Sequence, residues 1–488
     1  MAQKLFVEKV PNYVGGEWIE STGKEVLELT NPATGDRLGS VPVGTTADVD
    51  AAVKAAKAAF PKWRDTPAPT RARYLFDLRN VLEKHFEELS AICTQEHGKT
   101  LDESRGDVRR GIDNVECGAG IPSLMMGQAL EQIAGGIDCV SLRQPMGPFA
   151  AIVPYNFPAM VPFWFLPYCI ATGNTMIVKP SEQVPLSQHK VAQIIDQIGL
   201  PPGVVNYVNG AKDVVNGLCE HPDVKGVSFV GSSQVAEHVY TTATRRGKRV
   251  QALGGAKNFI VVMDDCDWDK TLGNLVESCY GCSGQRCLAG STILAVGKAY
   301  EPLKEKLVAA IKNIKVGYGM DRGVTMGPVI SKRHKEKVLG LVEAGIAEGA
   351  KLAIDGRGIR VPDYPNGHWV GPTLFDDVNP TMTIAQQEIF GPVMALLRAP
   401  TLDQALEIID AHPLANASSI YTSNGRHARE FVRRVPAAMV GVNIGVAAPM
   451  AFFTFGGSKG SFFGDLKAHG RDSIQFYTDN KTAITRWW

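Results

Sequence analysis

The sequence predicts an α/β fold with about three domains. Apolar residues at helical spacing alternate along the chain with short runs of β-branched residues, a pattern typical of sheets covered by helices. The chain has 488 residues, and a typical domain has about 150. Hydrophobic residues make up 44% of the chain and charged residues 21%. This balance is ordinary for a globular protein and excludes disorder as the dominant state.

Local periodicity predicts the elements in order. Apolar residues recur at helical spacing over residues 49–60 and again over residues 75–89, and the second pattern stops near Gly98. A further helix is expected at residues 234–246. Short β-branched runs predict buried strands at residues 150–153, 175–178, 226–230, 261–263 and 293–296.

Residues 144–178 carry no charged side chain but are rich in proline. Proline at this density prevents a continuous helix, and unsatisfied backbone groups are prohibitive in lipid. We therefore expect a buried, irregular segment that lines a site, not a transmembrane helix. The prolines are Pro145, Pro148, Pro154, Pro158, Pro162 and Pro167.

Charge and cysteine content exclude several classes of protein. The net charge of +1 gives no reason to expect a nucleic-acid partner, and the basic run at residues 245–249 is typical of a helix end. The nine cysteines are too scattered for a disulfide scaffold and favour a reducing compartment. The N-terminal residues lack the apolar stretch of a signal peptide, so we expect a cytoplasmic protein.

The turn after the strand at 226–230 is a candidate phosphate site. Gly231, Ser232 and Ser233 connect this strand to the helix at 234–246, and such a strand, turn and helix form the βα unit of dinucleotide-binding domains. The helix N-terminus offers free N–H groups to a phosphate. The turn lacks the G-x-G-x-x-G spacing, so a plain βα turn remains the alternative.

Cys287 is the candidate nucleophile. It lies among small residues directly after Arg286, and a neighbouring positive charge lowers the pKa of a thiol. A buried structural cysteine is the alternative. Cys279, Cys282 and Cys287 also have the spacing C-x2-C-x4-C, but a fourth ligand is missing, and no metal site is expected.

Two groups of polar residues adjoin apolar segments. Asn156 lies in the run Pro154-Tyr155-Asn156-Phe157-Pro158, where a rigidly held carboxamide is suited to stabilise an oxyanion. A turn-forming asparagine is the alternative. Lys179 and Glu182 follow a predicted strand, where both can bind ribose hydroxyls, and a surface ion pair is the alternative.

Taken together, these motifs resemble the aldehyde dehydrogenase superfamily over nearly the whole chain. Several motifs in the family's order and at about its spacing are far more specific than any single one. The motifs are Asn31-Pro32-Ala33-Thr34-Gly35, Pro154-Tyr155-Asn156-Phe157-Pro158, Lys179-Pro180-Ser181-Glu182, Phe229-Val230-Gly231-Ser232, Gly284-Gln285-Arg286-Cys287 and Glu388-Ile389-Phe390-Gly391-Pro392.

The resemblance implies the domain organisation. A Rossmann-like NAD-binding domain is expected over residues 1–120 and 144–252, and an α/β catalytic domain over residues 253–450. A small β oligomerisation arm is expected at residues 121–143 and 465–488, where it would join subunits into a homotetramer.

The resemblance also implies the site residues. Cys287 matches the nucleophile, and Asn156 together with the Cys287 backbone N–H matches the oxyanion hole. A carboxylate at Glu182 disfavours the 2′-phosphate of NADP, so NAD is the expected cofactor. The positions that match cofactor-binding groups are Val153, Tyr155, Lys179, Glu182, Gln183, Ser232, Leu253, Glu388 and Phe390.

One departure from the family pattern concerns the acyl acceptor. Hydrolytic members have Glu-Leu-Gly-Gly, whose Glu activates water, and in the run at residues 251–258 we expect Ala252 at that position. A methyl group takes no proton, and a positioned base contributes about 10²–10⁴-fold. A thiol ionises more readily than water and attacks thioesters well. Coenzyme A is therefore the expected co-substrate.

This departure is similar to the CoA-acylating branch of methylmalonate-semialdehyde and malonate-semialdehyde dehydrogenases, as is the run at residues 454–465. Arg286, and Arg110 with Arg109 as an alternative match, are further marks of the branch. Two guanidinium groups suit a substrate carboxylate, although a structural ion pair explains each one alone. The resemblance implies NAD-dependent oxidative decarboxylation of the semialdehyde to propanoyl-CoA or acetyl-CoA.

Two other functions remain open. A hydrolytic NAD-dependent semialdehyde dehydrogenase would release a free acid and needs another carboxylate as base, for which Glu277 is the candidate near in sequence. A non-catalytic protein on the same scaffold is the second. The presence of every expected catalytic residue except the water base argues against it.

Overall fold

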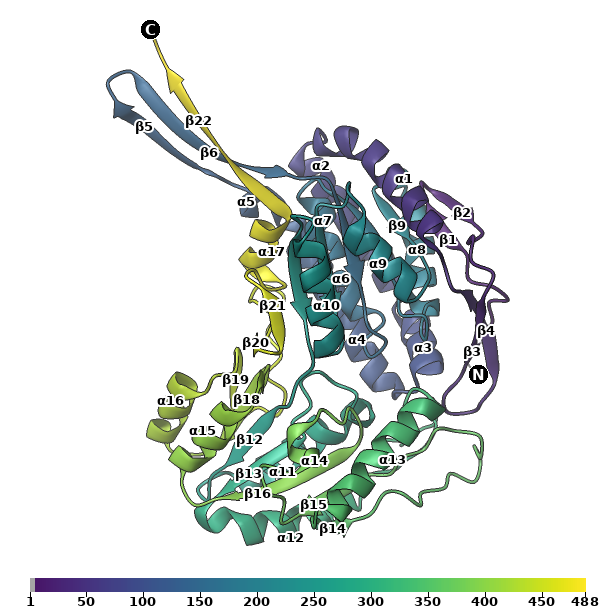
Figure 1. Cartoon of the computed structure of the whole chain (residues 1–488), viewed down its shortest axis with the longest axis vertical. Coiled ribbons are helices and arrows are strands. Elements are labelled where there is room, and N and C mark those ends of the chain that lie inside the picture. Colours follow the sequence, from purple (N-terminus) through teal and green to yellow (C-terminus); the bar gives the residue numbers. More distant parts are fainter. Residues whose placement is uncertain (1–4) are drawn as a thin grey trace.

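Two large sheets and a small projecting one organise the chain in the computed structural model, which describes residues 5–488 (Figure 1). The first sheet has eight strands. Its order is β2 (Glu17–Ile19), β1 (Asn12–Val14), β9 (Val205–Tyr207), β8 (Thr175–Lys179), β7 (Pro148–Ile152), β10 (Gly226–Val230), β11 (Arg249–Leu253) and β21 (Phe462–Gly464).

The order of the parallel strands in the first sheet creates a crevice. From β7 the chain proceeds through β8 to β9 on one side, and it then returns to place β10 and β11 on the other side of β7. The strand order therefore reverses between β7 and β10. In open parallel sheets, ligands bind outside the carboxyl ends of the strands at such a point.

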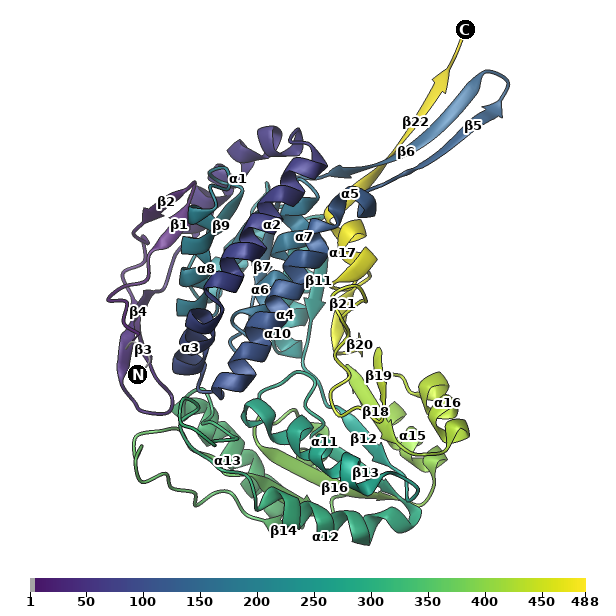
Figure 2. The same ribbon diagram turned by 180° about the vertical axis from the view of Figure 1, so that it is seen from behind.

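Helices cover both faces of the first sheet (Figure 2). The strands alternate their side chains between two apolar clusters, so that Ala151 and Val153 face one cluster while Ala150 and Ile152 face the other. The first cluster contains side chains of α2 (Ala68–Lys84), α3 (Phe86–His97), α4 (Leu101–Ala119), α6 (Met160–Phe163), α7 (Leu166–Ala171) and α8 (Leu186–Gln197). The second contains side chains of α1 (Thr46–Arg64), α9 (Lys212–Glu220) and α10 (Ser233–Thr244).

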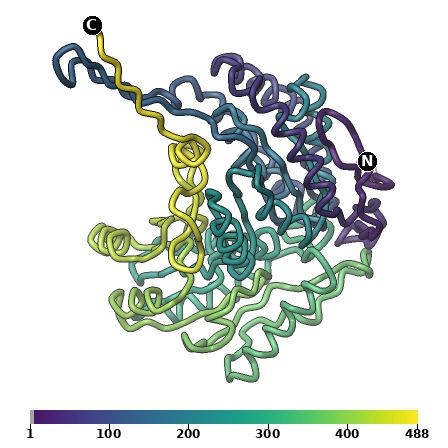
Figure 3. Tube along the Cα trace, turned by 45° about the horizontal axis from the view of Figure 1, so that its top comes forward, coloured from purple at the N-terminus to yellow at the C-terminus, as the bar shows by residue number. Residues whose placement is uncertain are grey.

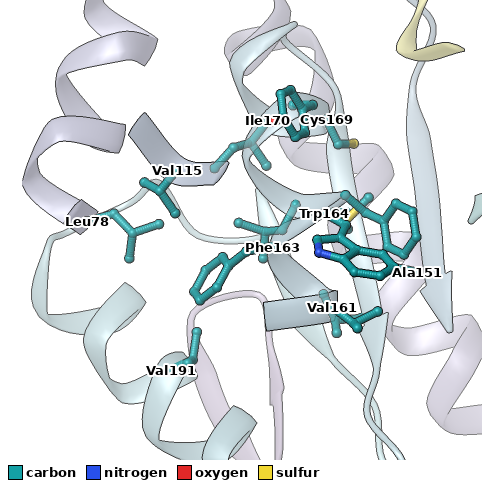
Figure 4. Packing of buried hydrophobic residues seen from close by; sticks show 14 of the residues in the cluster. Leu78, Val115, Ala151, Val161, Phe163, Trp164, Cys169, Ile170 and Val191 are labelled. Atoms are coloured by element: carbon teal, nitrogen blue, oxygen red, sulfur yellow. The ribbon is translucent and has the colours of Figure 1, made fainter. Parts of the chain in front are cut away.

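The proline-rich segment supplies much of the first cluster. Figure 4 shows Phe163 and Trp164 packed between the sheet residue Ala151 and the helical residues Leu78 and Val115. The segment forms β7, the short helices α6 and α7, and β8, and most of it is buried. Within residues 5–488, none of the helices is both long and apolar enough to cross a membrane.

The second sheet has seven strands, also covered on both faces. Its order is β14 (Lys351–Ile354), β15 (Thr373–Asp376), β16 (Val393–Ala399), β13 (Thr292–Val296), β12 (Phe259–Val262), β18 (Ala417–Tyr421) and β19 (Met439–Val442). On one face lie α11 (Trp268–Tyr280) and α12 (Tyr300–Ile311). On the other lie α13 (Lys332–Ala347), α14 (Thr383–Gln386), α15 (Leu402–Ala411) and α16 (Gly425–Arg434).

A three-stranded arm projects from the first sheet (Figures 1 and 3). It has the order β22 (Thr478–Arg486), β6 (Ile137–Pro145) and β5 (Gln128–Ala134). Before the arm, the C-terminal segment supplies β21 to the first sheet and packs α17 (Gly470–Tyr477) against α7. The C-terminal part of the arm therefore begins at Thr478, whereas residues 465–477 lie against the first sheet and its helices.

The expected elements are present with small shifts. All five predicted strands and the helix at 234–246 are confirmed, each within a few residues. The single apolar pattern over 75–89 is divided into α2 and α3 at His85, whose φ of −99° and ψ of 12° interrupt the helix. The remaining α-helix and strands are β3 (Val26–Thr30), β4 (Arg37–Pro42), α5 (Ile121–Leu124), β17 (Leu414–Ala415) and β20 (Ser458–Lys459).

Candidate active site

A cavity of about 680 Å³ contains the candidate nucleophile. Cys287, Arg286 and Arg110 all line it, together with aromatic side chains such as Trp164 and Phe455. Residues that are far apart in sequence thus meet around one thiol, on α4, on α11 and in the segments before β13 and after β19.

The loop before Cys287 is held in an unusual conformation. Cys282 and Ser283 have φ of 50° and 55°, and each such non-glycine residue costs about 1–3 kcal/mol. Two bonds compensate: the Cys282 N–H donates to a Glu103 carboxylate oxygen at 2.5 Å, and the Ser283 hydroxyl donates to the Gly327 carbonyl at 2.7 Å. This loop directs the chain toward the cavity at Cys287.

Two asparagines fix the backbone of Cys287. The side-chain amides of Asn258 and Asn416 each donate to the Cys287 carbonyl oxygen at 2.9 Å. Burial, together with the negative charge of Glu388, raises the pKa of the Cys287 thiol to about 12, while the thiol's own backbone N–H and Arg286 act in the opposite direction. The thiol is therefore protonated at neutral pH.

Asn156 lies beside the nucleophile loop with its carboxamide buried. Its Nδ2 donates to the carbonyl oxygen of Gln285 at 3.0 Å, and the Gln285 side chain in turn accepts the Ile330 N–H at 3.0 Å. A carboxamide nitrogen carries two hydrogens, so one remains for an oxyanion formed at Cys287. This placement favours the oxyanion role over that of a turn-forming residue.

A buried ion pair lies beneath Asn156. The Lys99 Nζ donates to the Asn156 carbonyl oxygen at 2.7 Å and to Asp107 Oδ2 at 3.0 Å, and both side chains are fully buried. The other Asp107 oxygen accepts the Met160 N–H at 2.7 Å. Burial opposes the charge on Lys99, but the Asp107 carboxylate outweighs it and raises the lysine pKa. The pair therefore holds both ends of the Asn156 loop.

The two adjacent arginines of α4 face different surroundings. Arg110 lines the cavity, where its Nη1 lies 2.8 Å from Met450 Sδ. Arg109 instead forms hydrogen bonds of 2.5 and 2.9 Å with the Glu83 carboxylate, and it lies over the Phe86 ring. Arg110 is thus the arginine that can reach a substrate near Cys287.

Arg286 is the centre of a charged network at the cavity wall. Its Nη2 lies 2.9 Å from Glu277 Oε1 and 3.6 Å from Glu103 Oε1. Its Nη1 donates to the Glu277 backbone carbonyl at 3.1 Å, and its Nε donates to the Cys282 sulfur at 3.3 Å. The Arg286 side chain is 13% exposed, so part of it remains accessible from the cavity.

The expected cofactor residues of the first sheet gather at one edge. Lys179 and Leu253 end β8 and β11, while Val153 and Ser232 follow β7 and β10. These are the carboxyl ends that flank the crevice between β7 and β10. Ser232 precedes α10 without capping it through its side chain, so the N–H groups at this helix end can donate hydrogen bonds to a phosphate.

Lys179 and Glu182 form a hydrogen-bonded ion pair of 2.8 Å. The ammonium group is almost buried, which distinguishes this pair from an ordinary surface ion pair. Burial opposes ionisation of Glu182, but Lys179 outweighs it and lowers the carboxyl pKa. The next residue, Gln183, is exposed, and its N–H donates to the Ser181 hydroxyl at 3.3 Å. An ionised carboxylate beside an ammonium group fits the hydroxyls of a ribose.

Glu388 and Phe390 lie on the second-sheet side of the site. Glu388 Oε1 accepts the Ala256 N–H at 3.0 Å, and burial raises the pKa of the Glu388 carboxyl to about 6. Phe390 has φ of 57°, its carbonyl lies 2.7 Å from His334 Nε2, and its ring meets Tyr155 edge-on at 5.9 Å. This cluster spans from the Asn156 loop to Glu388.

The structure corrects the position expected for the missing water base. Ala252 is fully buried in the cluster that contains Val227 and Phe229, because adjacent residues of a strand face opposite sides of the sheet. The next residue, Leu253, belongs to the other cluster, against which Cys287 packs. The side chain of β11 on the Cys287 side of the sheet is therefore that of Leu253, and leucine also takes no proton.

The cysteines before the nucleophile have other surroundings. Cys279 and Cys282 are buried free thiols, and Cys282 accepts a hydrogen bond from Arg286. Among residues 5–488, no group of three or more His, Cys, Asp or Glu side chains is arranged to hold a metal ion.

Four residues of the site have no counterpart in the sequence expectations: Lys99, Glu103, Asn258 and Asn416. Glu103 had a recognisable signal, since Thr100 and Glu103 have the spacing of a capping box and form one. The others act through contacts between distant segments, which local patterns do not report.

Comparisons with known proteins show similarity over nearly the whole chain. The model of the aldehyde dehydrogenase family matches residues 18–483. Malonate-semialdehyde dehydrogenase 2 of Geobacillus kaustophilus (strain HTA426) is 48% identical over 482 residues, with 99% of each chain covered. The crystal structure of a methylmalonate-semialdehyde dehydrogenase from Oceanimonas doudoroffii has a TM-score of 0.97 at 43% identity, with 99% of each chain covered. A protein of Sinorhizobium meliloti 1021, crystallised in complex with NAD, has a TM-score of 0.97 at 42% identity and the same coverage.

Proposed function

Because the chain belongs to the aldehyde dehydrogenase family, we propose that it is an NAD-dependent, CoA-acylating semialdehyde dehydrogenase. Malonate semialdehyde and methylmalonate semialdehyde are its substrates, and acetyl-CoA or propanoyl-CoA is the product, with release of CO2. The observation that carries the proposal is the shared cavity, in which the nucleophile Cys287 and the cations Arg110 and Arg286 meet. A three-carbon chain with an aldehyde at one end and a carboxylate at the other matches that arrangement.

In the first step the Cys287 thiol loses its proton to solvent, and its sulfur forms a bond with the aldehyde carbon. The carbonyl oxygen becomes an oxyanion, which the second Asn156 amide hydrogen and the Cys287 N–H stabilise. Arg110 and Arg286 orient the substrate through its carboxylate. The Asn258 and Asn416 bonds to the Cys287 carbonyl keep the N–H and the thiol in place during attack.

NAD, when bound, supplies the acceptor for the hydride that leaves the former aldehyde carbon. Lys179 and Glu182 would hold the hydroxyls of one ribose, the N–H groups at the α10 N-terminus would donate to the phosphates, and Glu388 would accept hydrogen bonds from the other ribose. These residues would hold the cofactor along the carboxyl edge of the first sheet. Loss of the hydride leaves a thioester on Cys287.

The thioester carbonyl then acts as an electron sink for the β-carboxylate. The bond to the carboxylate carbon breaks, CO2 leaves, and the electron pair forms an enolate whose oxygen remains at Asn156. A proton converts the enolate into a saturated acyl group. The thiol of CoA attacks the thioester, its proton is lost, and the Cys287 thiolate leaves and is reprotonated. The side chain of Leu253 provides no base for the competing attack by water.

The test is NADH formation from purified protein, NAD and malonate semialdehyde, with and without CoA, and with the product identified by mass. CoA-dependent formation of acetyl-CoA supports the proposal. Equal turnover without CoA, with release of a free acid, would establish the hydrolytic alternative. In that case Glu277 would be the first residue to replace.

A homotetramer in the cytoplasm completes the proposal. The arm carries exposed apolar side chains on all three strands, among them Leu130, Leu142 and Ile484, which supports contact with other subunits. All nine cysteines are free thiols, which supports a reducing compartment. Light scattering coupled to gel filtration tests the subunit number.

A further inference from the structure

Glu277 and Glu103 are two carboxylates that contact the same Nη2 atom of Arg286, but they are held very differently. Glu103 is 10% exposed, and its two oxygens also accept the N–H groups of Cys282 and Thr100. It is thus part of the folded loop. The Glu277 side chain is 65% exposed, and Arg286 is the partner of its carboxylate. Of the two, only Glu277 can move away without breaking the structure of the loop.

Arg286 does not need the Glu277 side chain for its own position. Three further contacts hold the guanidinium: the backbone carbonyl of Glu277 at 3.1 Å, the Cys282 sulfur at 3.3 Å and the Glu103 carboxylate at 3.6 Å. Gly281 lies against the guanidinium so closely that a Cβ there would be 2.5 Å from its carbon. The Glu277 carboxylate therefore pairs with a guanidinium group that other contacts already hold in place.

We propose that Arg286 pairs with the Glu277 carboxylate before the substrate binds, and that the substrate carboxylate takes the place of Glu277 on binding. This inference rests on the proposed function, because it takes a semialdehyde with a carboxylate as the substrate. Glu277 lines the same cavity as Cys287, so an incoming carboxylate directed at Arg286 meets Glu277 there. The exchange keeps the buried arginine paired at every stage, since an unpaired buried charge is costly. An aldehyde without a carboxylate leaves Glu277 in place.

The test compares kcat/KM for malonate semialdehyde and for propanal in Glu277→Gln and in a control variant. Removing the competing charge should raise kcat/KM for the semialdehyde up to about fivefold, the range expected for a partly exposed ion pair, through a lower KM. The value for propanal should not change. Glu277→Asp retains the charge, and its kcat/KM values should remain close to those of the unmodified protein.

Asp102→Asn is the matched control. Asp102 also lines the cavity, but it is 90% exposed and pairs with Arg105 at 2.8 Å. Loss of this charge should leave unchanged the ratio of kcat/KM for malonate semialdehyde to kcat/KM for propanal. A higher KM for the semialdehyde in Glu277→Gln would show that Glu277 positions Arg286. Equal changes in kcat/KM for both substrates would show a general effect of charge. Either result overturns the inference. If the unmodified protein does not oxidise the semialdehyde at all, the proposed function itself fails.

Discussion

The buried ammonium group of Lys99 donates a hydrogen bond of 2.7 Å to the backbone carbonyl oxygen of Asn156. The residue proposed to stabilise the oxyanion is thus held from below by a charged group that itself does not reach the cavity. Lys99 is fully buried and also paired with Asp107. We regard Lys99 as a positioning residue.

Lys99→Met should lower kcat about 10- to 100-fold, because a displaced donor loses much of the 10²–10³-fold that an oxyanion donor contributes. It should also reduce the free energy of unfolding by about 3–5 kcal/mol, since Asp107 is left buried without a partner. The double variant Lys99→Met/Asp107→Leu should regain much of this stability but not the activity. Urea unfolding and steady-state kinetics measure the two effects. Recovery of full activity in the double variant would contradict the positioning role.

Leu253→Glu should introduce CoA-independent hydrolysis. A carboxylate at this position faces the Cys287 side of β11, and a positioned base contributes about 10²–10⁴-fold, so release of free acid should increase at least tenfold. The comparison is Ala252→Glu, which places a charge in the opposite, fully buried cluster and should destabilise the protein without adding hydrolysis. Product analysis without CoA distinguishes the two. Hydrolysis in the Ala252 variant alone would restore the position expected from the sequence.

The affinity for NAD should decrease as the pH falls through about 6. Burial raises the pKa of Glu388 to about 6, so the carboxyl group is ionised above this pH and protonated below it. The protonated form loses acceptor capacity for ribose hydroxyls. The KM for NAD should therefore rise between pH 7 and pH 5, and Glu388→Gln should remove this dependence. An unchanged profile in that variant would assign the titration to another group.

Glu388→Gln should also make Cys287 react faster with a thiol reagent. The negative charge of Glu388 is one cause of the raised thiol pKa, so its removal increases the thiolate fraction at a given pH. The rate of labelling by iodoacetamide between pH 7 and pH 9 measures this effect. Cys287→Ser identifies the labelled residue. Unchanged labelling in the Glu388 variant would show that burial, not the charge of Glu388, raises this pKa.

Replacing Glu182 should weaken the preference for NAD over NADP. The Glu182 carboxylate is ionised and partly buried beside Lys179, and its negative charge repels a 2′-phosphate. In Glu182→Ala, Lys179 becomes free to pair with that phosphate. The ratio of kcat/KM for NADP to that for NAD should increase at least tenfold. An unchanged ratio would place the adenosine ribose elsewhere.

The strands and the nucleophile region were predictable because their signals are local. β-branched runs such as Gly226–Val230 have the period of a strand whatever surrounds them, and a cysteine after an arginine is visible in any alignment of motifs. The break at His85 was not predictable from periodicity, because apolar residues continue across it at helical spacing.

The assignment of Ala252 shows where sequence reasoning ends. When the match to the glycine motif moves by one residue, the motif still fits almost as well. The residue matched to the catalytic Glu then lies on the opposite side of the strand. Only the packing of β11 separates Ala252 from Leu253. Lys99 and Asn416 are a different case, since each acts on a residue that is more than fifty positions away.

The position of the C-terminal segment affects how the loss of activity in a cleaved or truncated chain should be interpreted. Ala451, Phe455 and His469 form part of the cavity wall, β21 closes one edge of the first sheet, and β22 continues directly into the arm. The cavity wall, one edge of the first sheet and the projecting arm therefore share one uninterrupted stretch of backbone. A cut or deletion anywhere along it propagates to all three, so inactivity of a shortened chain is not by itself a sign of a lost catalytic group.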